Sequence, residues 1–140
     1  AALVLASGAE VARKGLTPLV RIVGHAAYAG EPGWFTTAPI YAKERLFQKT
    51  GWSVDDVDLF EINEAFAAQA IGCMRELGIE NDHPNELGSG ISLGHPVACT
   101  GTRVLVTLLH EMKRRGARLG LECICGGGGL GIAAVFERTD

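Results

Sequence analysis

Short apolar runs alternate along the chain with amphipathic segments of helical period. The apolar runs lie at 3–5, within 17–30, within 53–62, at 119–125 and at 130–137. Runs of this length, bounded by Gly, Pro or Asp, are typical of β-strands. In the second run nearly every position from Leu19 to Val23 is apolar, which favours a sheet covered on both faces.

The amphipathic segments predict helices with recognisable ends. These helices are expected over 8–14, 38–50, 64–77 and from about Val97 to Arg115. Ser7 and Asn63 stand where N-caps are expected. Gly15, Gly51 and Gly116 stand where a left-handed residue would stop a helix.

Strands that alternate with helices, followed by a final hairpin, give the order βαβαβα-ββ. This order predicts one α/β layered domain over residues 1–140 with a mostly parallel sheet. One long loop, residues 79–96, is punctuated by glycines, and loops of that length in a compact domain tend to be functional or mobile.

Composition narrows the function classes. With 140 residues and 47% hydrophobic residues, the chain can bury one substantial core. The net charge of −3 gives no basic face for nucleic acid. The basic run 113–115 ends a helical pattern, where cations offset the helix dipole, although a contact to a phosphate group of a ligand is the alternative. The sequence shows neither an apolar stretch of about 18 residues nor a charged leader, so no membrane span is expected.

The four cysteines, Cys73, Cys99, Cys123 and Cys125, lack the spacing of a secreted disulfide framework. Reduced thiols in a cytoplasmic protein are therefore expected. The chain begins without Met, inside an apolar run, and this favours a chain that is part of a larger protein.

Three polar clusters follow predicted strands or precede predicted helices: Asn63 with Glu64, His95 with Pro96, and Cys125 with its glycines. In open α/β sheets, chemistry gathers at the carboxyl ends of strands and at the helix starts that follow them. The three clusters are therefore expected to meet, although they are far apart in sequence.

His95 is flanked by glycine and by Pro96, a residue suited to the first turn of a helix. At the positive end of a helix the imidazole would stay neutral and could accept a proton from a thiol. A hydrogen-bonded structural histidine is the alternative. His25, His83 and His110 lack such a setting and are expected to be structural or exposed.

Cys125 ends an apolar run and precedes the four glycines 126–129. Each glycine weakens a strand by about 0.5–1 kcal/mol, so the run favours a close-approaching ligand or a strained turn, and bare N–H groups can bind an oxyanion. A cysteine that only fills the strand is the alternative. A metal site of Cys123, Cys125 and His95 is disfavoured because the Cys-x-x-Cys spacing is missing. A strand rather than a helix follows the glycines, which argues against a phosphate loop.

Together, NEAFAAQA, then GHP followed by TGTRVLVTLLHEMKRRGAR, and CGGGGLGIA resemble the thiolases, specifically the acetyl-CoA acetyltransferase branch. Three blocks in this order and at this spacing are specific. The likeness also includes LVRIVG and the approach DVDLFEINEAF, and it concerns the C-terminal domain of those proteins.

The resemblance implies an α/β half with a five-stranded mixed sheet covered by helices. It also implies the condensation of two acetyl-CoA molecules to acetoacetyl-CoA, or the reverse thiolysis of 3-ketoacyl-CoA. The acyl group would be carried by a cysteine of an N-terminal domain, and no cysteine here matches it. The isolated chain is thus expected to be inactive. The complete protein is expected to form a homo-oligomer and to need no cofactor besides its CoA thioester substrate.

The resemblance also implies residue roles. His95 would deprotonate the nucleophilic cysteine, and Cys125 would exchange a proton with the methyl carbon of acetyl-CoA. Gly127 would offer its N–H to the acyl-enzyme oxyanion. Asn63, with His95, would hold a water or bind the thioester oxygen of the second substrate, and Phe66 would border the acyl and pantetheine pocket.

The chain departs from the family pattern after His95. Many relatives have GHPxGxxG, whereas Ala98 replaces the glycine here and Cys99 follows it. The chain length of the acyl substrate therefore stays open, and a degradative thiolase for long chains would use the same machinery. A non-catalytic module that binds acyl-CoA or lipid, or that dimerises, is a further alternative, although it would need no acid/base pair.

Overall fold

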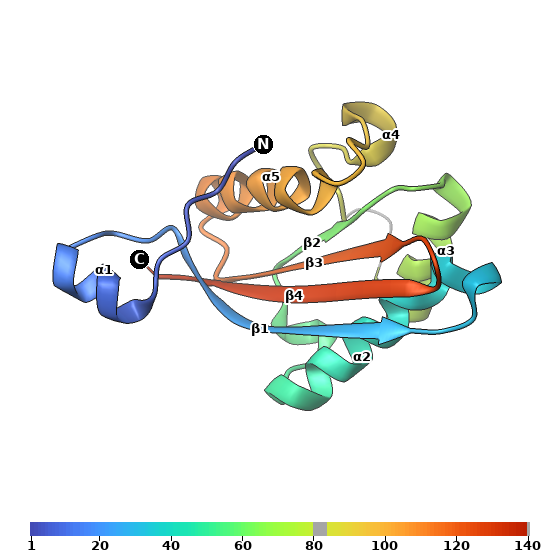
Figure 1. Ribbon diagram of the computed structural model, residues 1–140, viewed down its shortest axis with the longest axis horizontal. Helices are drawn as coiled ribbons and strands as arrows, with labels where there is room; N and C mark the ends of the chain where they lie inside the picture. The colour runs from blue at the N-terminus through green and yellow to red at the C-terminus, as the bar shows by residue number, and fades with distance from the viewer. Residues whose placement is uncertain (80–83, 140) are drawn as a thin grey trace.

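A four-stranded sheet forms the centre of the protein, in a computed structural model that describes residues 1–79 and 84–139 (Figure 1). The strand order is β1-β4-β3-β2. The strands are β1 (Val20–Ala29), β2 (Leu59–Ile62), β3 (Leu119–Gly126) and β4 (Leu130–Arg138). The last two form the antiparallel hairpin that the sequence predicted.

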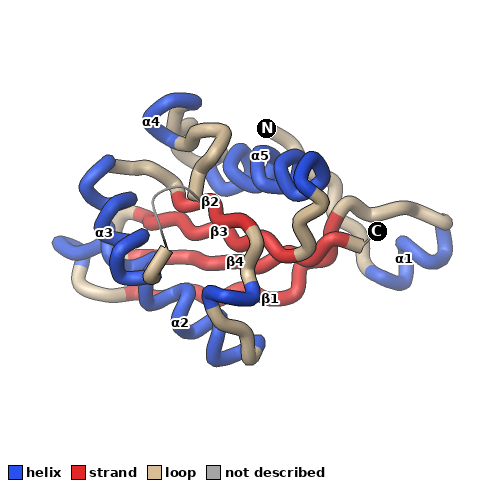
Figure 2. The backbone as a smooth tube through the Cα atoms, turned by 180° about the vertical axis from the view of Figure 1, so that it is seen from behind, coloured by secondary structure: helices blue, strands red, loops and turns tan. Residues whose placement is uncertain are grey.

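Helices cover both faces of the sheet, which confirms the layered α/β architecture. They are α1 (Gly8–Lys14), α2 (Ala38–Thr50), α3 (Ala67–Leu77), α4 (Gly90–Leu93) and α5 (Thr100–Arg115), with short 3₁₀ helices at Pro32–Thr37 and Val54–Asp56. Helix α5 lies on one face, and α2 and α3 lie on the other (Figure 2). The described helices do not include one that is long and apolar enough to cross a bilayer.

Each face of the sheet buries its own apolar cluster. On the α5 face, Leu108 and Met112 pack with Leu59 of β2. On the opposite face, Leu46 and Ile62 belong to the larger cluster. The alternation of side chains along β2 therefore fixes which residues meet α5 and which meet α2 and α3.

The predicted helix ends are confirmed where local chemistry decides them. Ser7 caps α1, because its hydroxyl accepts a 3.2 Å hydrogen bond from the Glu10 N–H. Gly15, Gly51 and Gly116 take left-handed φ angles of 60°, 75° and 69° and close α1, α2 and α5. Few other residues adopt this conformation without strain.

Three expectations about the strands are wrong for the described residues: a strand at residues 3–5, a sheet of five strands rather than four, and a mostly parallel sheet. Residues 3–5 form no strand, and the Val4 side chain is 99% exposed. The sheet is also not mostly parallel, because only β2 and β3 run parallel while β4 is antiparallel to both of its neighbours. An apolar run indicates a strand but does not specify its partner or its direction, which tertiary pairing decides.

The strand β1 is an edge strand and is not covered on both faces as expected. All of its positions but Gly24 are exposed or partly buried, and Ile22 is exposed. Helix α5 packs on β2 and β3, at the far side of the sheet order from β1. The apolar run therefore overstated how much of β1 is buried.

Two helices begin later than the sequence predicted. Helix α5 starts at Thr100 rather than near Val97, because Ala98 has a left-handed φ of 71° that a helix cannot contain. Helix α3 starts at Ala67 with Phe66 at the cap position, so Asn63 is not an N-cap. Both shifts leave polar residues in non-helical segments before the helices.

Candidate active site

The carboxyl ends of β2 and β3 bring two of the predicted site residues together. The two strands are parallel, with Ile62 opposite Cys123. Beyond that pair, the Asn63 N–H donates a 2.9 Å hydrogen bond to the Cys123 oxygen. Cys125 lies two residues further along β3, so Asn63 and Cys125 share this edge of the sheet.

Asn63 is completely buried, and both polar atoms of its side chain lack a hydrogen-bond partner among the described residues. A buried polar group without a partner costs about 1–3 kcal/mol. Such groups therefore require an explanation, and an ordered water or a ligand is the usual one. A water or a polar ligand atom at the end of β2 would supply the missing partner of Asn63.

The segment that precedes His95 is docked against Asn63. A side chain at Gly90 would meet the Glu64 main-chain oxygen at 2.6 Å and the Asn63 Oδ1 at 3.1 Å, so the backbone of α4 approaches the end of β2 closely. The Glu64 carboxylate accepts a 3.0 Å hydrogen bond from the Ile91 N–H. Figure 1 shows α4 and the start of α5 near the end of the sheet toward which β3 points.

Asn85 holds the same segment in place and was missed by sequence reasoning. Its side chain accepts a 2.7 Å hydrogen bond from the Ile62 N–H and donates a 2.8 Å bond to the Ile62 oxygen. Its own N–H donates to the Phe60 oxygen at 3.0 Å. Asn85 thus satisfies the free edge of β2, and its φ of 58° is one that Asn tolerates better than most residues. An Asn within a glycine-punctuated loop was the available signal.

His95 lies between α4 and α5 with its side chain exposed. Its Nδ1 is 2.7 Å from the Oγ1 of Thr100. Among the described residues, the His95 ring and the Cys125 thiol do not hydrogen-bond to each other, and His95 follows the docked helix α4 two residues after its end. His25 and His110 are exposed as expected, and His83 lies outside the described residues.

Cys125 is 8% exposed at the end of β3. Burial raises the pKa of its thiol, and the neighbouring Cys73 adds to the rise. Burial also raises the pKa of Cys73 and Cys123. Cys125 therefore rests as a thiol at neutral pH and holds a proton that it can donate. All four cysteines of the chain are free.

Different structural requirements explain why glycine occupies the positions after Cys125. Gly128 and Gly129 take φ angles of 85° and 88° in the hairpin turn, and a side chain at Gly129 would meet the Gly30 oxygen at 2.2 Å. The turn and this backbone contact explain both of them without a ligand. Gly127 has no such reason, because it is exposed and a Cβ there would meet nothing within 4 Å. Gly127 therefore presents open backbone.

Phe66 lies three residues after Asn63, directly before α3. Its side chain is 59% exposed. Phe66 therefore lies four residues after the end of β2 with an exposed ring that an apolar ligand could cover.

Two other kinds of site were considered from the sequence, a metal site and a phosphate contact at the basic run 113–115. The described residues contain no cluster of His, Cys, Asp or Glu that could hold a metal ion. In the basic run, Arg114 and Arg115 both bind the Glu111 carboxylate, and Arg115 also pairs with Glu86. The two arginines of this run therefore form ion pairs at the C-terminal end of α5.

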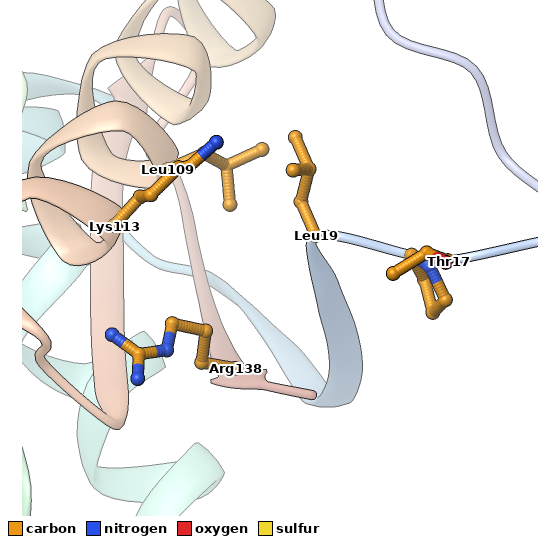
Figure 3. Close-up of a pocket in the computed structure, with 6 residues that line it drawn as sticks. Thr17, Leu19, Leu109, Lys113 and Arg138 are labelled. Carbon is orange, nitrogen blue, oxygen red and sulfur yellow. The ribbon is translucent and has the colours of Figure 1, made fainter. Parts of the chain in front are cut away.

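A small pocket lies at the opposite end of the sheet. Figure 3 shows Leu109 and Lys113 of α5 opposite Leu19, which precedes β1, and Arg138 at the end of β4 also lines the pocket. Arg138 pairs with Val20 in the sheet, whereas Cys125 pairs with Gly131 near the hairpin turn. This pocket is thus separate from the strand ends that carry Asn63 and Cys125.

Comparison with known proteins decides the family. Residues 16–138 match the family model described as "Thiolase, C-terminal domain". The chain belongs to the thiolase family. As in the sequence-based expectation, the match is to the C-terminal part of a thiolase.

Individual thiolases are similar over nearly the whole chain. An acetyl-CoA acetyltransferase of Chromobacterium violaceum is 49% identical over 99% of this chain and 35% of that protein. Among solved structures, the Bacillus anthracis acetyl-CoA acetyltransferase has a TM-score of 0.92 and 44% identity, over 95% of this chain and 34% of that one. Human mitochondrial 3-ketoacyl-CoA thiolase has a TM-score of 0.93 and 38% identity, over 96% and 34%. The chain therefore spans about a third of these thiolases and has the fold of that part.

Proposed function

We propose that this chain supplies the acid/base half of a thiolase active site, which acts on acetyl-CoA or a 3-ketoacyl-CoA. The nucleophilic cysteine would lie outside residues 1–140. The observation that carries the proposal is the meeting of Asn63 and Cys125 at neighbouring strand ends, with the segment that leads to His95 docked on Asn63. The names of the relatives, acetyl-CoA acetyltransferase and 3-ketoacyl-CoA thiolase, support the substrate class.

The first half-reaction transfers the acyl group to the enzyme. The His95 imidazole accepts the proton of the nucleophilic thiol, because the thiolate is the attacking form. The thiolate attacks the thioester carbonyl of the first substrate, and the C–S bond to CoA breaks. Cys125 is protonated at neutral pH because the pKa of its thiol is raised, and it gives its proton to the departing CoA sulfur.

The second half-reaction forms the carbon–carbon bond. The Cys125 thiolate removes a proton from the methyl carbon of a second acetyl-CoA. Asn63, through a water, and His95 stabilise the resulting enolate oxygen. The carbanion attacks the acyl-enzyme carbonyl, and the Gly127 N–H binds the oxyanion. The nucleophilic sulfur then leaves and recovers its proton from His95, which gives acetoacetyl-CoA and one free CoA.

Two further parts of the proposal concern the substrate pocket and the cellular compartment of the protein. The exposed ring of Phe66 would border the acyl and pantetheine chain of the substrate. The four free cysteines suit a reducing compartment such as the cytoplasm.

The test uses the complete protein that carries this chain. Acetoacetyl-CoA is added without free CoA, and mass spectrometry locates the acetyl group. We expect acetylation of one cysteine outside residues 1–140, with Cys125 unmodified, and release of acetyl-CoA when CoA is added. Acetylation at Cys125, or CoA binding without any acyl-enzyme, would contradict the proposal, and the second result would favour a binding module.

A further inference from the structure

Thr100 makes two short contacts through one hydroxyl group. Its Oγ1 lies 2.9 Å from the main-chain oxygen of Pro96 and 2.7 Å from Nδ1 of His95. Thr100 is 3% exposed, so the hydroxyl is enclosed by protein. The left-handed residue Ala98 lies in the turn between Pro96 and Thr100, which brings the Thr100 hydroxyl to both the Pro96 carbonyl and the His95 ring.

The number of protons decides the direction of both bonds. A hydroxyl has one proton to donate, and a carbonyl oxygen can only accept. If Thr100 donated to Nδ1, its oxygen would face the Pro96 oxygen at 2.9 Å without a proton between them, which is repulsive. Both contacts are hydrogen bonds only when Thr100 donates to Pro96 and His95 donates from Nδ1.

We infer that Thr100 is a positioning residue that holds His95 in the Nδ1–H tautomer and leaves Nε2 as the bare, proton-accepting nitrogen. Which ring nitrogen carries the proton is set by the partner of the other nitrogen. The tautomer itself does not depend on the proposed function. Its catalytic consequence does, because in that function the bare Nε2 would accept the proton of the nucleophilic thiol. Thr100 itself touches no reacting atom.

The tautomer can be read directly, without an assay of activity. In the complete protein with ¹⁵N-labelled histidine, the protonated and the bare ring nitrogen of neutral imidazole have well-separated chemical shifts. We expect His95 to show a protonated Nδ1 and a bare Nε2. Thr100→Val removes the hydroxyl while keeping the branched shape, and Nε2–H should become the main form. Thr100→Ser keeps the hydroxyl and should keep the original tautomer.

The rate of enzyme acylation gives the second readout. If Nε2 is the base, Thr100→Val should slow acylation by about 10-fold or more, and Thr100→Ser should stay within about twofold of the original rate. The serine variant separates loss of the hydroxyl from damage to the start of α5.

The two readouts fail independently. A protonated Nε2 in the unmodified protein, or an unchanged tautomer in Thr100→Val, would overturn the inference whatever the rate. A tautomer switch with an unchanged acylation rate would support the role of Thr100 and refute His95 as the base in the proposed function. Equal losses of rate in both variants, without a tautomer change, would leave Thr100 only a structural residue and so refute the inference.

Discussion

The main-chain N–H of Asn63 is bonded to the main-chain oxygen of Cys123 at 2.9 Å, and this bond continues the β2–β3 ladder past the last residue of β2. This bond fixes the position of Asn63 along the strand direction relative to Cys125 on the next strand. In the proposed function, the two residues would therefore act on a substrate from one rigid edge of the sheet rather than from separate loops.

Replacement of Cys125 should separate the two half-reactions. In the complete protein, Cys125→Ser should lower Claisen condensation by about 10²–10⁴-fold, because a hydroxyl is a much weaker acid/base group for a carbon-bound proton. Acylation of the enzyme should fall far less, since CoA thiolate leaves readily. Stopped-flow measurement of both steps checks this. Cys99→Ser is the control, and equal losses in both steps for Cys125→Ser would remove its assigned role.

Gly127→Ala should reduce activity without reducing stability. A methyl group at this position meets no protein atom within 4 Å, so the melting temperature should stay the same or rise slightly. The same methyl would project where substrate oxygen is expected, and kcat/KM should fall by about 10-fold or more.

Gly129→Ala provides the matched control for Gly127→Ala. Its φ of 88° and the Gly30 oxygen at 2.2 Å from the added carbon should destabilise the hairpin, so its melting temperature should fall. If Gly127→Ala lost stability as strongly as Gly129→Ala, or kept full activity, open backbone at Gly127 would not serve the reaction.

Glu61 should make the folded state sensitive to pH. Burial raises the pKa of its carboxyl from 4.5 to about 8; Arg103 opposes the rise, and the neighbouring carboxyls of Glu64 and Glu122 add to it. The folded state thus holds a proton that the unfolded state loses above pH 4.5. The resulting stability is complete below that pH and is lost as the pH rises through about 8.

Glu61→Gln should therefore raise the melting temperature near pH 9 and have little effect near pH 4.5. Each unit of pKa shift corresponds to about 1.4 kcal/mol, so the gain at alkaline pH should be a few kcal/mol. Thermal unfolding followed across this range checks it. Glu44→Gln on the exposed side of α2 is the control, and a parallel pH dependence in the Glu61→Gln and unmodified proteins would contradict the prediction.

Ala98→Gly should stabilise the turn before α5. A left-handed φ costs a residue with a Cβ about 1–2 kcal/mol, and glycine avoids this cost while gaining some freedom in the unfolded chain. We expect a net gain of up to about 1 kcal/mol in the free energy of unfolding. Ala12→Gly, in the exposed middle of α1, is the same substitution at a helical φ and should have the opposite sign. A loss of stability in Ala98→Gly would show that the Ala98 methyl group makes a compensating contact.

Local chemistry explains which parts of the fold could be predicted. Ser7 and Gly116 act through their own backbone neighbourhood, so the sequence locates the start of α1 and the end of α5. The hairpin also forms between adjacent segments. The residues 3–5 were misassigned because their apolar pattern does not say whether a sheet lies within reach. The direction of β1 depends on its partner β4, more than 100 residues later.

The candidate site shows the same division. Asn63, His95 and Cys125 were found because their residue types and motifs are distinctive. Thr100 was not, because its importance lies in the path of the chain between residues 95 and 100 and in the positive φ of Ala98. Alanine at that position predicts a helix rather than the turn that exists.

The raised pKa of the Cys125 thiol has a consequence for oxidative damage. Peroxide reacts with thiolates, and a protonated, shielded sulfur at the end of β3 is a poor target for sulfenic acid formation. In the proposed mechanism this sulfur gives up its proton only during turnover, and it would be open to oxidation at that stage. Oxidation of Cys125 by hydrogen peroxide, located by mass spectrometry, should therefore be faster in a protein that is turning over substrate than in one at rest.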